Sequence, residues 1–298
     1  MPNDVVFAPR KFAAVTLALV CVVAACFAAT AWLLRFDLDR LLFARTASPV
    51  SPGGAAEAFR LSGHDGAAMI VRRFDSAAGT PRQGCVVFFP GHAGGVDRYA
   101  SEFFPDLQKA GLVVYAVAYP GQDGAPGPAR IDDVQALAAT AVSTVVASCG
   151  RDHTVVAGRS LGAMIAAYAA GAVSCAGLVM ESASPSLSAG IRAALRERWF
   201  LRPLALLPIE RIVRHDFSIA EALPAGLHVA IFQGSADTRT PLADFASEAG
   251  GPDRLPIIEV SGGTHADTLQ RAKAAMISAM LGMIRGSDEA SAAGTSDD

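Results

Sequence analysis

Apolar residues recur along the chain in two patterns. The stretches Cys85–Gly91 and Leu112–Gly121 are short, almost continuous apolar runs, which are typical of strands buried on both faces. Between such runs, Asp132–Ser148 repeats its apolar residues at helical spacing, with one stripe that includes Val134, Leu137 and Val145. This alternation of strands and helices predicts a mostly parallel, twisted sheet with helices on both faces.

The rest of the region follows the same alternation. Further strands are expected at 57–63, 67–74, 154–160, 177–183, 228–237 and 256–263, and further helices at 97–110, 161–172 and 266–284. One segment, 184–223, interrupts the pattern because it is rich in leucine, arginine and bulky aromatic residues. It lies between two strands, and we expect it to form a small helical cap over the sheet.

The N-terminal region carries a different signal. No residue from Phe12 to Leu34 is charged, and this length matches the roughly 20 residues that a bilayer-spanning helix needs. We expect an uncleaved signal-anchor, with two alternatives. The A-x-A at Ala29–Ala31 could end a cleaved signal peptide, and Val23–Cys26 resembles a bacterial lipoprotein signal. The apolar run continues past Ala31, which argues against cleavage there.

Charges beside this segment hardly decide its orientation. Two basic residues precede it and three follow soon after, so the preference for basic residues on the cytoplasmic side is weak. The short N-terminal tail favours export of the C-terminal part. We therefore expect a tail and membrane anchor over 1–43, with the span at about 12–34. A linker over 44–56, an α/β domain over 57–284 and a disordered tail over 285–298 follow.

Composition changes this view little. The formal net charge is −3, with acidic and basic residues interspersed, so the chain lacks the basic footprint of a nucleic-acid-binding protein. Three of the five cysteines, Cys85, Cys149 and Cys175, lie in the α/β domain, at spacings that fit no zinc motif. Cys149 and Cys175 each precede a predicted strand, so they form either a disulfide or two separate buried thiols.

A candidate nucleophile lies in the sequence G-x-S-x-G at Gly158–Gly162. Ser160 falls where a buried strand ends and a helix begins, and a sharp turn there would expose its hydroxyl. Glycines on both sides remove the β-carbons that would clash in so tight a turn. The helix N-terminus also offers free N–H groups to a developing oxyanion.

A serine nucleophile needs a base, and the base needs an acid. His265 is the histidine in a loop after the last predicted strand, at the carboxyl end of the sheet, where reactive groups of parallel sheets gather. Asp237 ends the preceding strand at the same edge, with an alternative role as a helix N-cap. Glu181 is a substitute acid, whereas Asp267 is too close in sequence to His265.

The order Ser160, Asp237, His265 resembles that of the α/β-hydrolase superfamily from about residue 57 to 284, with "GRSLG", "GSADTRTP" and "GGTH" as the best-matched pieces. The chain also resembles membrane-anchored serine hydrolases with a small cap. The resemblance implies the α/β-hydrolase fold and an oxyanion hole formed by the N–H groups of Leu161 and His92. Pro90 replaces the usual histidine of this loop, which puts the loop's supporting hydrogen bonds in question.

From these residues we expect a serine hydrolase that cleaves a carboxylic ester or thioester through an acyl-enzyme, with no metal or organic cofactor. A peptidase or amidase with the same triad, or a non-catalytic binding protein, is the alternative. The cap arginines form either a solvated helix face or a site for an anionic substrate or lipid headgroups. The apolar cap residues are expected to pack over the pocket, with membrane binding as the alternative; they are Trp199, Phe200, Leu204, Leu206 and Leu207. In either case they favour an apolar, small-molecule or lipid-like acyl substrate.

Overall fold

The architecture was obtained as a computed structural model, which describes residues 9–44, 54–247 and 255–294. Within these ranges eight strands form one sheet in the order β1-β2-β4-β3-β5-β6-β7-β8. The strands β1 and β2 pair antiparallel to their neighbours, and every other pair is parallel. The predicted α/β-hydrolase fold, with its mostly parallel sheet, is confirmed.

The element bounds are as follows. The strands are β1 Glu57–Ser62, β2 Ala68–Phe74, β3 Gly84–Phe89, β4 Leu112–Ala118, β5 Thr154–Arg159, β6 Gly177–Glu181, β7 Val229–Gly234 and β8 Ile257–Val260. The helices are α1 Pro9–Phe36, α2 Leu38–Leu42, α3 Val96–Glu102, α4 Phe104–Lys109, α5 Ile131–Cys149, η1 Arg151–His153, α6 Leu161–Ala172, α7 Leu187–Glu197, η2 Arg202–Leu206, α8 Ile209–Ile212, α9 Ile219–Ala222, α10 Leu242–Ser247 and α11 Thr268–Gly294.

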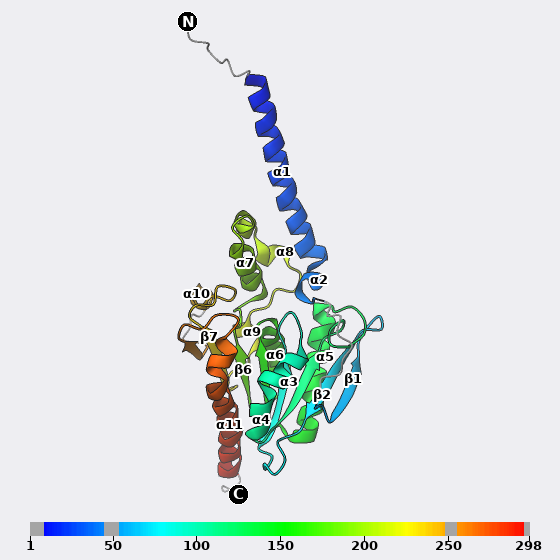
Figure 1. Cartoon of the computed structure of the whole chain (residues 1–298), viewed down its shortest axis with the longest axis vertical. Helices are drawn as coiled ribbons and strands as arrows, with labels where there is room; N and C mark the ends of the chain where they lie inside the picture. Colours follow the sequence, from blue (N-terminus) through cyan, green and yellow to red (C-terminus); the bar gives the residue numbers. More distant parts are fainter. Residues whose placement is uncertain (1–8, 45–53, 248–254, 295–298) are drawn as a thin grey trace.

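An apolar layer packs against each face of the sheet. Helices α5 and α6 pack on one face, and α3, α4 and α11 pack on the other (Figure 1). Every residue of β3, β4 and β5 is buried, which is why these strands read as continuous apolar runs in the sequence. The central strands therefore hold their carboxyl ends in fixed positions.

The structure differs from the prediction at two helices. The helix expected over 97–110 is divided into α3 and α4, because Phe103 leaves helical geometry and is fully buried, and Pro105 at the start of α4 has no N–H to continue the ladder. At the other end, α11 continues to Gly294, ten residues past its expected end at Ile284 and into the segment expected to be disordered.

The cysteine pairing was also not foreseen. Cys85 on β3 forms a disulfide with Cys149 at the end of α5, and Cys175 is free. The expected alternatives for Cys149, a bond to Cys175 or a separate thiol, are both wrong. The bond joins α5 to the neighbouring central strand β3, through two cysteines that lie 64 residues apart in sequence.

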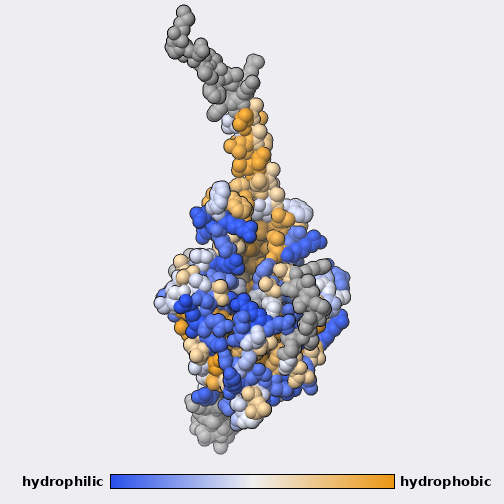
Figure 2. Space-filling view, in the orientation of Figure 1, coloured by the Kyte–Doolittle hydropathy of each residue, from blue (hydrophilic) through white to orange (hydrophobic). Residues whose placement is uncertain are grey.

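The N-terminal apolar helix α1 projects from the sheet domain as a separate column with a hydrophobic surface (Figures 1 and 2). Its stretch Ala13–Phe36 is long and apolar enough to cross a membrane. The chain that follows is packed into the domain: Phe43 is 5% exposed, with its ring 5.5 Å from that of Tyr119, and Asp39 accepts a hydrogen bond from the N–H of Ile131.

The segment 184–223 is helical, as expected, and comprises α7, η2, α8 and α9. Its large apolar residues are not all placed as expected. Trp199, Phe200 and Leu206 are 79%, 55% and 82% exposed, so the expectation that they pack over a pocket is wrong for these three. Leu204 and Leu207 are partly buried.

Candidate active site

Ser160 occupies a sharp turn between β5 and α6. Its φ is +52° and its ψ is −121°, a backbone conformation that residues with a side chain rarely adopt. Two backbone hydrogen bonds fix the turn: the N–H of Ser160 donates to Glu181 O on β6, and the N–H of Ala163 donates to Ser160 O. The strand–turn–helix context expected for this serine is therefore present.

Glycines on both sides of the serine allow this turn. A β-carbon on Gly158 would lie 2.2 Å from the carbonyl oxygen of Gly162. A β-carbon on Gly162 would lie 2.2 Å from the carbonyl oxygens of Phe89 and Pro90, in the loop after β3. The expectation that glycine is needed to avoid clashes at both positions is confirmed.

His265 and Asp237 meet at the carboxyl end of the sheet. His265 Nδ1 lies 2.9 Å from Asp237 Oδ2. The carboxylate also accepts hydrogen bonds from the N–H groups of Arg239 and Thr240 and from the Thr240 hydroxyl, and Asp237 is only 4% exposed. Burial alone would raise the pKa of Asp237, but the hydrogen bonds from His265 and Thr240 outweigh it and lower that pKa to about 2.

The other two carboxylates have different partners. Asp267 accepts from the N–H and hydroxyl of Thr264 and pairs with Arg271, which together lower the pKa of Asp267. Glu181, the substitute acid, is fully buried and lies 2.8 Å from Arg159 Nε. Of the three acids considered, Asp237 is therefore the one hydrogen-bonded to His265.

Arg159, the residue before the serine, connects the two halves of the site. Its guanidinium forms an ion pair with Glu181, although Nε and Oε2 are not aligned as a hydrogen bond. Its Nη2 donates a hydrogen bond to the backbone carbonyl of His265, at a distance of 2.5 Å. Burial raises the pKa of Glu181, and the charge of Arg159 opposes that shift. Sequence reasoning missed this residue, although a charge at the end of a buried strand was a usable signal.

The Ser160 hydroxyl does not contact His265 through a hydrogen bond in this structure. Within the described residues this hydroxyl makes no hydrogen bond, whereas His265 and Asp237 are already in contact. The tether from Arg159 to the His265 backbone nevertheless brings the histidine loop to the residue adjacent to Ser160. Catalytic hydrogen bonds are often longer without substrate than with it.

The loop after β3 lies against the serine. A β-carbon on Gly91 would lie 3.6 Å from Ser160 Cβ, so the backbone that carries His92 passes beside the turn. Leu161 is the first residue of α6, where helix N–H groups lack helical partners. Both amides assigned to an oxyanion hole thus belong to segments that flank Ser160.

Side chains from the loop that follows β4 support the loop after β3. The Tyr119 hydroxyl donates to Pro90 O, and Gln122 Nε2 donates to His92 O and to Ala44 O. These bonds provide support that the substitution at Pro90 had put in question. His92 is exposed, and its Nδ1 lies 2.8 Å from the carbonyl oxygen of Leu42 in α2.

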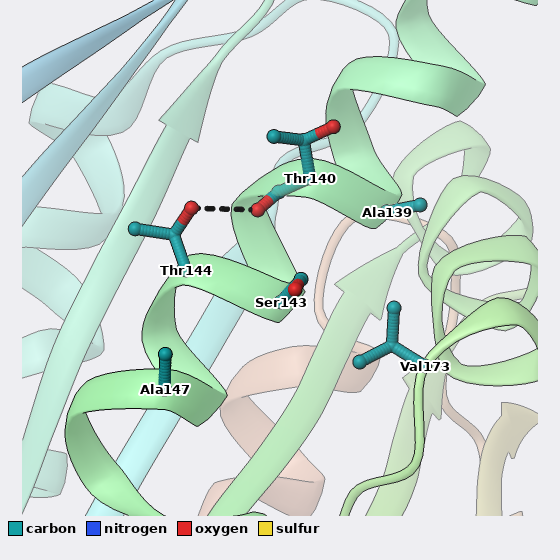
Figure 3. Close-up of a pocket in the computed structure, with 6 residues that line it drawn as sticks. All are labelled: Ala139, Thr140, Ser143, Thr144, Ala147 and Val173. Carbon is teal, nitrogen blue, oxygen red and sulfur yellow. Dashed lines mark hydrogen bonds between the residues drawn. The ribbon is translucent and has the colours of Figure 1, made fainter.

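A hollow of about 590 Å³ lies elsewhere on the surface, between α5 and the start of the loop after α6 (Figure 3). Its walls are small residues and hydroxyls: Ala139, Thr140, Ser143, Thr144, Ala147 and Val173. None of the predicted site residues lines it. Among the described residues no cluster of three potential metal ligands occurs.

Residues 86–287 match the sequence profile of the alpha/beta hydrolase family. An esterase from Pyrococcus furiosus superposes with a TM-score of 0.57 at 14% identity, over 82% of this chain and 96% of that one. An esterase from the planctomycete Thermogutta terrifontis, Est2, gives a TM-score of 0.53 at 18% identity, over 77% and 94%.

Esterase 2 of Thermogutta terrifontis phosphoramylated by tabun gives a TM-score of 0.50 at 17% identity, over 82% of this chain and 96% of that one. No curated protein sequence matched this chain. At these identities the structural matches support the fold alone, whereas the family profile covers most of the chain.

Proposed function

Because the chain belongs to the alpha/beta hydrolase family, we propose that it is a serine hydrolase that cleaves a carboxylic ester or thioester. The observation that carries this proposal is the 2.9 Å contact between His265 and Asp237, at the sheet edge where Ser160 occupies its strained turn. Two proteins with similar folds are named as esterases, which agrees with this proposal.

The proposed reaction has two steps, acylation of Ser160 and hydrolysis of the acyl-serine. His265 Nε2 removes the proton of the Ser160 hydroxyl as its oxygen attacks the carbonyl carbon, and the imidazolium then protonates the leaving alcohol or thiol. His265 then removes a proton from water as the water oxygen attacks the acyl-serine carbonyl. The bond to Ser160 breaks, the carboxylic acid is released, and the His265 imidazolium returns its proton to the Ser160 oxygen. Asp237 stays ionised and accepts from Nδ1–H, which holds the reactive tautomer and stabilises the imidazolium.

The negative charge on the tetrahedral carbonyl oxygen needs two N–H donors. We assign these to the amides of Leu161 and His92, which belong to the segments on either side of the serine. No metal or organic cofactor takes part in the proposed reaction. The chemistry would also serve amide cleavage, so a peptidase or amidase is the second candidate.

We further propose that α1 anchors the protein in a membrane, with the hydrolase domain over 57–284, including the cap at 184–223, on the exported side. The apolar length of α1 supports the anchor. The Cys85–Cys149 disulfide supports export, because disulfides persist in oxidising compartments and are rare in the cytosol.

The test of the reaction is turnover of p-nitrophenyl esters by the purified full chain in detergent. We expect Ser160→Ala and His265→Ala to lose activity, whereas Ser143→Ala, an exposed serine on α5, keeps the wild-type rate. Equal rates for wild type and Ser160→Ala would exclude the nucleophile. A wild type that cleaves p-nitroanilides but no ester would favour the amidase, and no turnover of either would favour a binding protein.

A further inference from the structure

The connection from α7 through η2 exposes an unusual group of side chains, here called the cap tip. It consists of Arg196, Arg198, Trp199, Phe200, Arg202 and Leu206. Its three large apolar members are 79%, 55% and 82% exposed, while its arginines are exposed as well. Scattered apolar residues are normal on soluble surfaces, but a cluster with two aromatic rings 5.9 Å apart marks an interaction surface.

The segment that carries the cap tip also contacts the end of the apolar helix α1, through α8 and the residues just after it. Arg35 Nη1, near the end of α1, donates to Ile212 O in α8, and the Arg214 guanidinium lies 5.1 Å from the centre of the Phe36 ring. In Figure 1 the α7–α8 region rises on the side of the molecule from which α1 departs, next to the base of that helix. These two contacts hold α8 and the residues just after it against the end of α1.

The chemistry of the cap tip fits the boundary between lipid headgroups and acyl chains. Tryptophan is enriched at that boundary, and arginine buries its apolar stem while its guanidinium meets phosphate. Figure 2 shows hydrophilic residues gathered on the cap beside the hydrophobic column of α1. A purely solvated surface would not need the two aromatic rings, and a purely apolar interface would not need the arginines.

We propose that the cap tip docks into the headgroup region of the same bilayer that α1 spans. The inference rests on the proposed membrane anchor, and it goes further: the domain is held against the membrane at two points. The contacts between the end of α1 and the α8 region determine the choice of occupant. If α1 enters the bilayer at Phe36, these contacts place the segment that carries the cap tip at the bilayer surface.

Docking at two points would place the proposed active site near the membrane. His92, on the proposed oxyanion loop, contacts Leu42 of α2, six residues after the end of α1. The reactive side of the sheet is thereby close to the membrane end of the molecule. The class of substrate that this arrangement favours is an ester or thioester whose acyl chain resides in the bilayer.

The test uses the two tryptophans of the chain, Trp32 in α1 and Trp199 in the cap tip. Trp32→Phe leaves Trp199 as the only indole, and Trp199→Phe leaves Trp32. Each full-length variant is placed in nanodiscs whose lipids are either unbrominated or brominated near the headgroup end of the acyl chain. We expect bromine to quench the emission of both variants, and the Trp199 emission to be blue-shifted relative to that of free indole in water.

A control variant carries both tryptophan-to-phenylalanine changes plus Ile258→Trp, at an exposed position on β8, and its emission should be unaffected by bromine. If Trp32 is quenched and Trp199 is not, the cap tip stays in water and the inference is wrong, while the anchor stands. If Trp32 is not quenched, the anchor itself fails and the inference falls with it. A blue-shifted Trp199 that bromine does not quench would mean that protein, and not lipid, covers the cap tip, which also overturns the proposal.

Discussion

The buried ion pair between Arg159 and Glu181 offers the most demanding prediction. Glu181 is fully buried, and its carboxylate lies 2.8 Å from a guanidinium that is itself only 10% exposed. Glu181→Gln keeps the shape of the side chain but leaves the arginine charge without its partner. Breaking a buried pair in this way costs about 3–5 kcal/mol of unfolding free energy.

This loss should be visible by thermal unfolding in one fixed detergent. For a domain of this size, 1 kcal/mol corresponds to roughly 2–4 °C, so we expect Tm to fall by about 6–20 °C. The matched control is Glu102→Gln, because Glu102 pairs with Arg98 at 3.0 Å but on an exposed helix surface. Exposed pairs contribute about 0–1 kcal/mol, so this control should move Tm by a few degrees at most.

A double variant separates the two roles of Arg159. Arg159→Met with Glu181→Leu removes both charges, and replacing a buried pair by apolar groups is often neutral for stability. We expect Tm to recover, but kcat to fall with KM unchanged, since the donor to His265 O is gone. Equal Tm for Glu181→Gln and Glu102→Gln, or full activity in the double variant, would refute this reasoning.

Asp237→Asn should lower kcat by about 10⁴-fold. The wild type should also be more stable to unfolding than this variant, because the pKa of Asp237 is lowered from 3.8 to about 2 in the folded protein. This advantage is complete above pH 3.8 and disappears as the pH falls towards 2. Gly162→Ala should lower Tm severely, because its β-carbon meets two carbonyl oxygens, whereas Gly282→Ala in α11, with open space around it, should be stabilising by about 1 kcal/mol. Cys85 and Cys149 should resist alkylation in intact membranes until a reductant is added, and ready alkylation beforehand would contradict both the disulfide and the export of the domain.

Much of the fold was readable from the sequence because it depends on local pattern. The fully buried strands β3 and β4 appear as unbroken apolar runs, and α6 was predicted with its observed bounds, Leu161–Ala172. The turn at Ser160 was also readable, since glycine spacing at a strand–helix junction reports a steric requirement of the backbone itself.

Other features depend on contacts between distant segments, which a single sequence does not encode locally. The Cys85–Cys149 bond requires knowing that the end of α5 lies beside β3. The tether from Arg159 to His265 joins residues 106 positions apart. Trp199 is 79% exposed although its apolar character alone suggested burial, because burial depends on which distant segments pack against a side chain.

The central claim, that Ser160 is an activated nucleophile, is tested most directly by reaction with a fluorophosphonate probe. The purified full chain is treated with the probe, digested, and the modified peptide located by mass spectrometry. We expect a single adduct on Ser160 that is absent from Ser160→Ala and strongly reduced in His265→Ala. A wild type that does not react, or an adduct that persists in Ser160→Ala, would contradict the account.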